Sequence, residues 1–89
     1  MREPFLEVTF RHGRALAAYY YLPRRPGDQC HRTAVAAPGL LIDFNRSGKP
    51  TGIEITAPSK VTLAALNRIL RDLGSPPAKR ADLAPLRAA

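Results

Sequence analysis

Residues 40–56, LLIDFNRSGKPTGIEIT, decide the fold of this chain. The centre of the stretch, NRSG at residues 45–48, is typical of a type I turn, in which Asn is favoured at the first position and Gly at the fourth. The residues on either side form short apolar runs of strand length. The stretch therefore predicts two antiparallel strands joined by a tight turn.

The register of this hairpin follows from its apolar pattern. If the type I turn alone sets the register, the apolar residues of the two strands fall on opposite faces of the hairpin, because side chains alternate with a period of two. An offset of one residue brings Ile42 opposite Ile53 and reunites the apolar residues on one face. Either a two-residue turn at residues 47–48 or a bulge at residues 51–52 supplies the offset. We favour the bulge, since a glycine inside a strand often marks one.

The residues before this hairpin predict up to three more strands. Residues 5–11 alternate between apolar and polar side chains, which indicates a half-buried strand, and the His-Gly pair at residues 12–13 is a turn. Residues 15–22 are apolar on both faces, which suggests a central strand covered on both sides. Residues 23–29 contain two prolines and a glycine and form a loop, and residues 30–37 form a weaker, alanine-rich strand.

The period of the apolar residues changes after Pro58. Ser59 or Thr62 can cap a helix near residues 60–73, and Gly74 stands where a C-terminal glycine cap belongs. The apolar stripe of this helix has helical spacing and comprises Val61, Leu63, Leu66, Ile69, Leu70 and Leu73.

The predicted fold class is α+β: an antiparallel β-sheet of four or five strands, a meander of hairpins, with a C-terminal α-helix packed on one face. Residues 1–74 form a single small domain, and residues 75–89 form a Pro/Ala-rich C-terminal tail. The core is thin, since a chain of this size buries only about 60–65% of its unfolded surface. The tail either forms a helical turn anchored by Leu83 and Leu86 or stays unordered.

The same stretches resemble the YuzE-like family of short bacterial proteins of unknown function. The similar segments are VTF at 8–10, ALAAYYYL at 15–22, LLIDF at 40–44, a polar turn ending in Gly48, GIEI at 52–55 and APS at 57–59. The chain departs from the family at residues 11–14, where a basic turn replaces an acidic one, and at residues 23–27, where the loop is longer. The resemblance implies a small β-sheet fold with no established activity. Because some relatives are thought to be antitoxin-like partners of small toxins, it also implies a regulatory protein partner.

The composition is strongly basic, with 14 Lys and Arg against 7 Asp and Glu and a formal net charge of +7. Such a charge predicts nucleic-acid binding where the cations cluster, but here they are spread along the sequence, and a GC-rich genome would also enrich arginine. No apolar run reaches the roughly 20 residues that span a bilayer, the first residues lack the apolar stretch of a signal peptide, and a lone cysteine excludes an internal disulfide. These features predict a cytoplasmic protein without membrane contact.

No residue pattern predicts a catalytic, cofactor or metal site, and we expect no enzyme activity. The Gly-Lys pair at residues 48–49 lacks the other residues of a phosphate-binding loop. Cys30 and His31 point to opposite faces unless their segment is a loop, and one cysteine with two histidines lacks the spacing of zinc ligands. Asp43 and Glu54 share the face opposite the isoleucines. Paired carboxylates can do acid–base work in a cleft, but an ion pair with arginine or exposure to solvent is the commoner arrangement.

Two functions remain as candidates, and both use the tyrosines at residues 19–21. The favoured one is a non-enzymatic protein-interaction or regulatory module whose partner is another protein or a second copy of the chain. The interface residues that we predict are Leu41, Tyr19 and Tyr21. The alternative is a basic RNA- or DNA-binding module in which aromatic rings stack on bases beside arginines. Its predicted residues are Arg14, Arg24, Arg25, Arg32, Tyr19 and Tyr21.

The two faces of the sheet differ in what covers them. The helix covers one face only, which leaves Leu41 and one set of tyrosines on the other, and the strand at residues 30–37 is a weak edge. An uncovered apolar face and a weak edge favour a twofold dimer. The alternative is a monomer in which Leu83 and Leu86 fold back over that second face.

Overall fold

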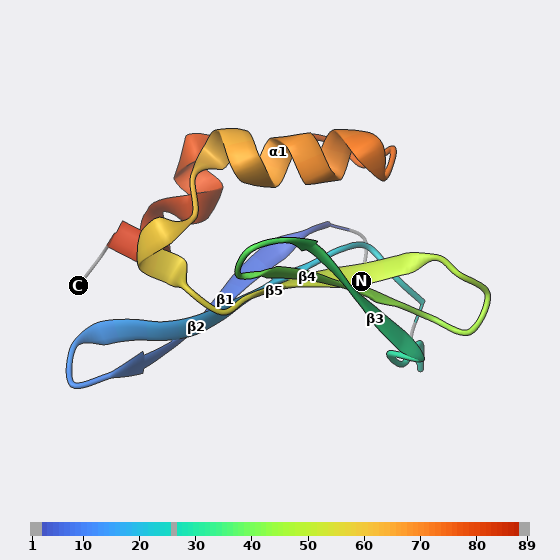
Figure 1. Cartoon of the computed structure of the whole chain (residues 1–89), viewed down its shortest axis with the longest axis horizontal. Helices are drawn as coiled ribbons and strands as arrows, with labels where there is room; N and C mark the ends of the chain where they lie inside the picture. The colour runs from blue at the N-terminus through green and yellow to red at the C-terminus, as the bar shows by residue number, and fades with distance from the viewer. Residues whose placement is uncertain (1–2, 26, 88–89) are drawn as a thin grey trace.

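A computed structural model of the chain describes residues 3–25 and 27–87, which form a five-stranded antiparallel sheet with a helical layer on one face (Figure 1). The strands are β1 (Phe5–Arg11), β2 (Arg14–Tyr21), β3 (Arg32–Ala37), β4 (Leu40–Phe44) and β5 (Pro50–Ile55). The helical segments are the 3-10 turn η1 (Pro58–Lys60), the helix α1 (Leu63–Asp72) and the 3-10 helix η2 (Arg80–Arg87). The α+β class predicted from the sequence is confirmed.

The strands follow the order β1-β2-β5-β4-β3, so β5 lies at the centre and β1 and β3 form the edges. A meander that simply followed the sequence would place β2 beside β3, but the structure inserts β5 and β4 between them. β5 takes this position because its apolar side chains match those of β2: Ile53 lies opposite Tyr20, and Ile55 lies opposite Ala18. The alanine-rich β3 offers less apolar surface and is left at the edge.

The β4–β5 hairpin has the predicted register. Ile42 lies opposite Ile53, and the pairing then shifts because Thr51 is an extra residue in β5. This is the predicted bulge. The buried Thr51 hydroxyl donates a hydrogen bond to the backbone carbonyl of Asp43 at 3.3 Å, so the bulge leaves no buried hydroxyl unpaired. Gly48 closes the turn in left-handed backbone, with a φ of 87°.

Helix α1 begins and ends where its capping residues predict. The Thr62 hydroxyl accepts a hydrogen bond from the Ala65 N–H at 3.1 Å, which satisfies one of the unpaired N–H groups of the first turn. Gly74 follows the helix with a φ of 72°, and the Ser75 N–H returns to the Leu70 carbonyl at 2.8 Å. Among the described residues, no helix has the length and apolar character needed to cross a membrane.

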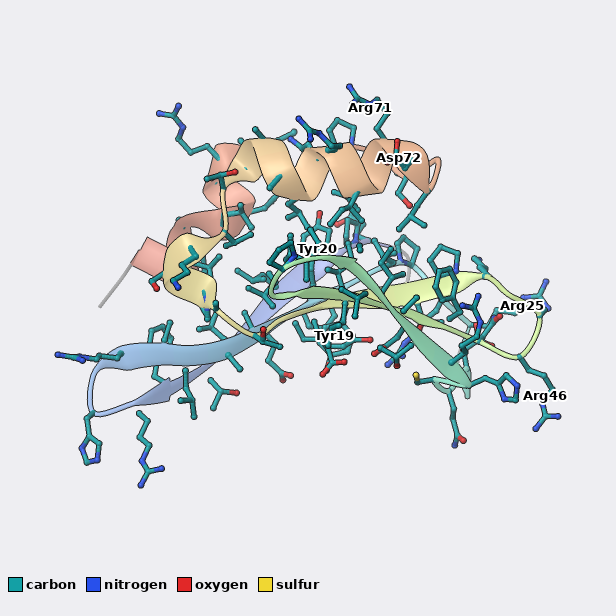
Figure 2. All side chains as sticks on the ribbon, in the orientation of Figure 1. Tyr19, Tyr20, Arg25, Arg46, Arg71 and Asp72 are labelled. Atoms are coloured by element: carbon teal, nitrogen blue, oxygen red, sulfur yellow. The ribbon has the colours of Figure 1, made fainter. Side chains whose placement is uncertain are left out.

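The hydrophobic core lies between the sheet and the helical layer. Tyr20 points from β2 toward α1 (Figure 2). It packs with Ile53, Ile55, Leu66 and Leu70, and none of the five is more than 1% exposed. The prediction that both faces of residues 15–22 are covered is wrong, because α1 and η2 lie on the same side of the sheet (Figure 1).

The C-terminal tail belongs to this core. Ala78, Leu83 and Leu86 are buried in the same apolar cluster, and η2 contacts β1. Asn67 of α1 fixes the start of the tail, because its side-chain amide donates to the Ala78 carbonyl at 3.1 Å and accepts from the Ala78 N–H at 2.7 Å. The alternative in which Leu83 and Leu86 cover the second face is therefore wrong: they complete the first.

Candidate functional site

In the described part of the chain, no helix covers the face of the sheet opposite α1, and we call it the open face (Figure 1). Strand alternation and pairing assign its side chains. They are Phe5, Glu7 and Thr9 of β1, Ala17, Tyr19 and Tyr21 of β2, Gly52 and Glu54 of β5, Leu41 and Asp43 of β4, and Thr33 and Val35 of β3. Phe5 is 47% exposed and Val35 is 74% exposed. The open face therefore presents large apolar side chains to solvent.

Tyr19 lies across the centre of the open face, on the other side of the sheet from Tyr20 (Figure 2). Its ring rests directly on the backbone of Gly52, where a β-carbon would lie 2.1 Å from the Cε1 atom of Tyr19. Any side chain at this position would have to displace the ring. The glycine in β5 thus makes room for Tyr19, while the extra residue of the bulge is the neighbouring Thr51.

A chain of hydrogen bonds runs from Tyr19 across β4 to β3. The Tyr19 hydroxyl donates to Oδ2 of Asp43 at 2.7 Å, and the Thr33 hydroxyl donates to Oδ1 of Asp43 at 2.7 Å. Asp43 is only 6% exposed, so these hydroxyls replace the water that the carboxylate would otherwise bind. The expectation of solvent exposure is wrong for Asp43, because Tyr19 and Thr33 cover its carboxylate.

This environment keeps Tyr19 protonated. Burial, followed by the hydrogen bond to Asp43 and the negative charge of that carboxylate, raises the pKa of Tyr19 well above the usual 10.0. The phenol is thus a neutral hydrogen-bond donor at physiological pH. Glu54 lies two residues from Gly52, opposite Leu41, and no hydrogen bond joins it to Asp43 among the described residues. The two carboxylates therefore do not form an acid–base pair here.

Tyr21 extends the aromatic surface toward β1. Its ring stacks on Phe5 with the centroids 4.5 Å apart, and it lies 4.6 Å from the ring of Tyr19. Its hydroxyl donates to Glu7 at 3.0 Å, and this hydrogen bond is the main cause that raises the pKa of Tyr21. The guanidinium of Arg24 lies 5.3 Å from the ring centroid. The three rings form one continuous aromatic cluster.

The predicted nucleic-acid residues do not form one surface. Arg25 and Arg32 lie at the end of the sheet where residues 27–31 approach the turn 45–49, and we call this region the loop end. Arg24 stands next to Arg25 in the sequence, but its guanidinium lies over the ring of Tyr21 on the open face. Arg14 lies in the β1–β2 hairpin at the opposite end (Figure 1). Tyr19 and Tyr21 lie on the open face, together with the predicted interface residue Leu41.

The sequence pattern did not predict some of the residues that belong to the loop end and to the open face. At the loop end these are Arg46 and Lys49, which belong to the turn between β4 and β5. Only the pairing of β3 with β4 brings this turn beside Arg25 and residues 27–31, so the local sequence pattern contained no signal for it. On the open face, Val35 was missed because its strand looked weak, and Phe5 because its pairing with Tyr21 was not considered.

Neither nucleophilic nor metal chemistry is assembled around Cys30. The exposed Cys30 thiol lies 3.4 Å from the Thr33 hydroxyl and 3.7 Å from the Arg32 carbonyl. No hydrogen bond to His31 is present in the described structure, so the two do not form a nucleophile–base dyad. Within residues 3–25 and 27–87, no group of three or more His, Cys, Asp and Glu side chains could hold a metal ion.

Comparison with known proteins gives no relative: no family model matches the chain, and searches of curated proteins and of solved structures find no match. The similarity to the YuzE-like family stays a prediction from the residues. The open face and the loop end are the features from which a function can be inferred.

Proposed function

We propose that this chain is a non-enzymatic, regulatory protein-interaction module that binds a partner protein through the open face of its sheet. The observation that supports this most is the set of exposed and half-buried apolar side chains on that face, from Phe5 at one edge to Val35 at the other. A solvated face of an antiparallel sheet normally carries polar side chains. A large exposed apolar patch instead marks a binding surface.

The open face is also held in shape before any partner arrives. Hydrogen bonds to Asp43 fix Tyr19 and Thr33, and stacking on Phe5 together with the bond to Glu7 fixes Tyr21. Binding to a preorganised surface loses less conformational entropy than binding to a mobile one. These contacts therefore support recognition by the face as a unit.

The charges of the open face indicate the chemistry of the partner. Glu7 and Glu54 lie on this face of a chain whose net charge is +7. A second copy stacked face to face would bring carboxylates against carboxylates, which disfavours the contact. An apolar partner surface bordered by Lys or Arg is complementary, and Arg24 over the ring of Tyr21 is an example of such a contact within the chain. We therefore favour a different protein over a homodimer.

The resemblance to the YuzE-like family supports a small toxin as this partner, and the chain would then act as its antitoxin-like regulator. Such pairs are encoded side by side, so the candidates to test are the products of the adjoining genes. The tagged chain should be expressed together with each product and purified, and the bound protein should be quantified. A partner in stoichiometric amount is the expected result.

The interaction surface is tested by two variants that add the same charge. Val35→Lys places a cation on the open face, and Ala64→Lys places one on the exposed side of α1. Both positions are exposed, so circular dichroism should be unchanged. We expect Val35→Lys to lose the partner and Ala64→Lys to retain it. Equal retention by both variants, or no partner for the native chain, would contradict the proposal.

A further inference from the structure

The loop end contains two adjoining hollows with polar walls, separate from the open face. The larger, of about 450 Å³, is lined by residues 27–31 and by Asn45, Arg46 and Ser47. The smaller, of about 230 Å³, is lined by Arg25, Asp28, Asn45, Ser47 and Lys49. The two hollows share Asp28, Asn45 and Ser47 as a common wall. Figure 2 shows Arg25 and Arg46 at this end of the sheet.

Hydrogen bonds fix the shape of both walls. The side-chain carbonyl of Asn45 accepts from the Ser47 N–H at 3.0 Å, from the Ser47 hydroxyl at 2.9 Å and from the Lys49 N–H at 2.8 Å. On the facing segment, the Arg25 N–H donates to the Asp28 carboxylate at 3.1 Å, and the Asp28 N–H donates to the Arg25 carbonyl at 3.1 Å. A ligand would therefore need to order only the long cationic side chains.

Positive charge dominates these walls. Arg25, Arg46 and Lys49 line the hollows, and none of them forms an ion pair with a carboxylate among the described residues. The carboxylate in the lining, that of Asp28, already accepts a hydrogen bond from backbone. Arg32 stands nearby, with its guanidinium 4.3 Å from the ring centroid of Phe44. The local charge thus favours an anionic ligand.

We propose that the loop end binds the phosphate groups of a nucleic-acid strand. A guanidinium can donate two parallel hydrogen bonds to a phosphate, and a lysine adds a mobile point charge. The net charge of +7 would also steer a polyanion toward the chain. Contacts of this kind position the strand without reading its sequence.

The open face is unsuited to the same ligand. Tyr19 and Tyr21 donate their hydroxyls to Asp43 and to Glu7, and these carboxylates repel phosphate. In this proposal the two tyrosines take no part in nucleic-acid binding. The phosphate site and the protein-binding face are then two different surfaces of one chain, and either can be lost without the other.

The test is the fluorescence anisotropy of a labelled single-stranded oligonucleotide of mixed sequence, titrated with the full chain at several salt concentrations. The native affinity should fall as salt rises, through counterion release. The double variant Arg25→Ala/Arg46→Ala should bind on the order of tenfold more weakly near about 0.1 M salt. Its plot of log affinity against log salt should be shallower by about 1.4, because each phosphate contact on a single strand contributes about 0.7.

The matched control removes the same charge from the other end of the sheet. Arg11→Ala/Arg14→Ala alters the β1–β2 hairpin, where these arginines line a different hollow with His12. This control variant loses positive charge but no phosphate contact, so only the long-range electrostatic field of the protein changes. Its affinity for the oligonucleotide should therefore stay within about threefold of the native value. Equal losses for the two double variants would overturn the proposal, as would a native chain that does not bind at low salt.

Competitors separate the sources of phosphate. Unlabelled RNA and DNA strands should both displace the probe, because the contacts are to the phosphate backbone. Binding of inorganic phosphate at the loop end, followed by nuclear magnetic resonance, without any binding of the oligonucleotide would assign the hollows to a small phosphate ligand and overturn the nucleic-acid proposal.

Discussion

The ring of Tyr19 and the backbone of Gly52 are in direct contact, with no space for a β-carbon between them. Gly52 does not adopt the left-handed backbone that favours glycine, so only the ring excludes a side chain. In an open strand position, Gly→Ala would stabilise the protein by roughly 0.5–1 kcal/mol. Here we expect Gly52→Ala to destabilise it by about 1–3 kcal/mol, the usual cost of overpacking, as measured by urea denaturation.

The same substitution in a Tyr19→Ala background is the control for this prediction. The three atoms nearest to the added methyl group all belong to the Tyr19 side chain, so without the ring the second change should be neutral or stabilising. The two effects should then be strongly non-additive. Equal destabilisation by Gly52→Ala in both backgrounds would show that the ring is not the cause.

Leu66 connects α1 to the sheet, and its side chain is fully buried. Leu66→Ala should lower the free energy of unfolding by about 2–5 kcal/mol. Leu66→Asp should unfold the domain, because an unpaired charge in an apolar core costs several kcal/mol or more. Far-UV circular dichroism, which should show more strand than helix for the native chain, reports both effects. Arg68→Ala, on the exposed side of α1, is the control, and a folded Leu66→Asp variant would contradict the packing.

Asn67 is expected to hold the tail on the core. Asn67→Ala removes both hydrogen bonds to Ala78 and leaves a buried backbone N–H and carbonyl without partners, at a cost of about 1–3 kcal/mol each. Hydrogen exchange should therefore accelerate at Ala78 and along η2, while the amides of β4 and β5 keep their protection. Unchanged exchange in η2 would mean that Leu83 and Leu86 alone hold the tail.

Alkaline pH should destabilise the fold through its three tyrosines. Burial raises the pKa of Tyr19 and of Tyr20, and the hydrogen bond to Glu7 raises that of Tyr21, all from the usual 10.0. Because the folded values lie above the unfolded ones, the stability that the phenols contribute is fully present below about pH 10. It is lost as the pH rises through the folded values.

Ultraviolet absorbance at the tyrosinate band measures this titration. At about pH 10 the tyrosines of the chain unfolded in concentrated guanidinium should be half ionised. The folded chain should show little tyrosinate at the same pH. Above that pH, the midpoint of urea denaturation should fall. Coincident titration curves for the folded and unfolded chain would refute the assignment.

The β4–β5 hairpin and α1 could be predicted closely because the information that sets them is local. The need to place Ile42 and Ile53 on one face required an offset of one residue, and the favoured source of that offset, a bulge at residues 51–52, is present in the structure. Thr62 and Gly74 likewise mark the ends of a helix through contacts with residues only a few positions away. Such features depend on little beyond backbone geometry and alternation.

The features that could not be predicted depend on contacts between distant segments. The insertion of β5 beside β2 reflects a competition between strands for apolar surface, which no single segment reveals. The contacts of Tyr19 with Gly52 and Asp43, and the approach of Arg46 to the segment of Arg25, follow from that strand order. For the same reason the sequence located Leu41, Tyr19 and Tyr21 on one face but omitted Phe5 and Val35.

The strand that is synthesised last, β5, is the one that joins the sheet together. On the ribosome, β1 and β2 emerge first and β3 and β4 follow, but neither hairpin has its neighbour until residues 50–55 are available. A lone hairpin is marginally stable in water, so the nascent chain should stay protease-sensitive if it is stalled before Pro50. Once β5 enters, both halves gain a partner in the same step. Folding of this chain should therefore be a late, cooperative event that is completed when β5 pairs with β2 and β4 at the centre of the sheet.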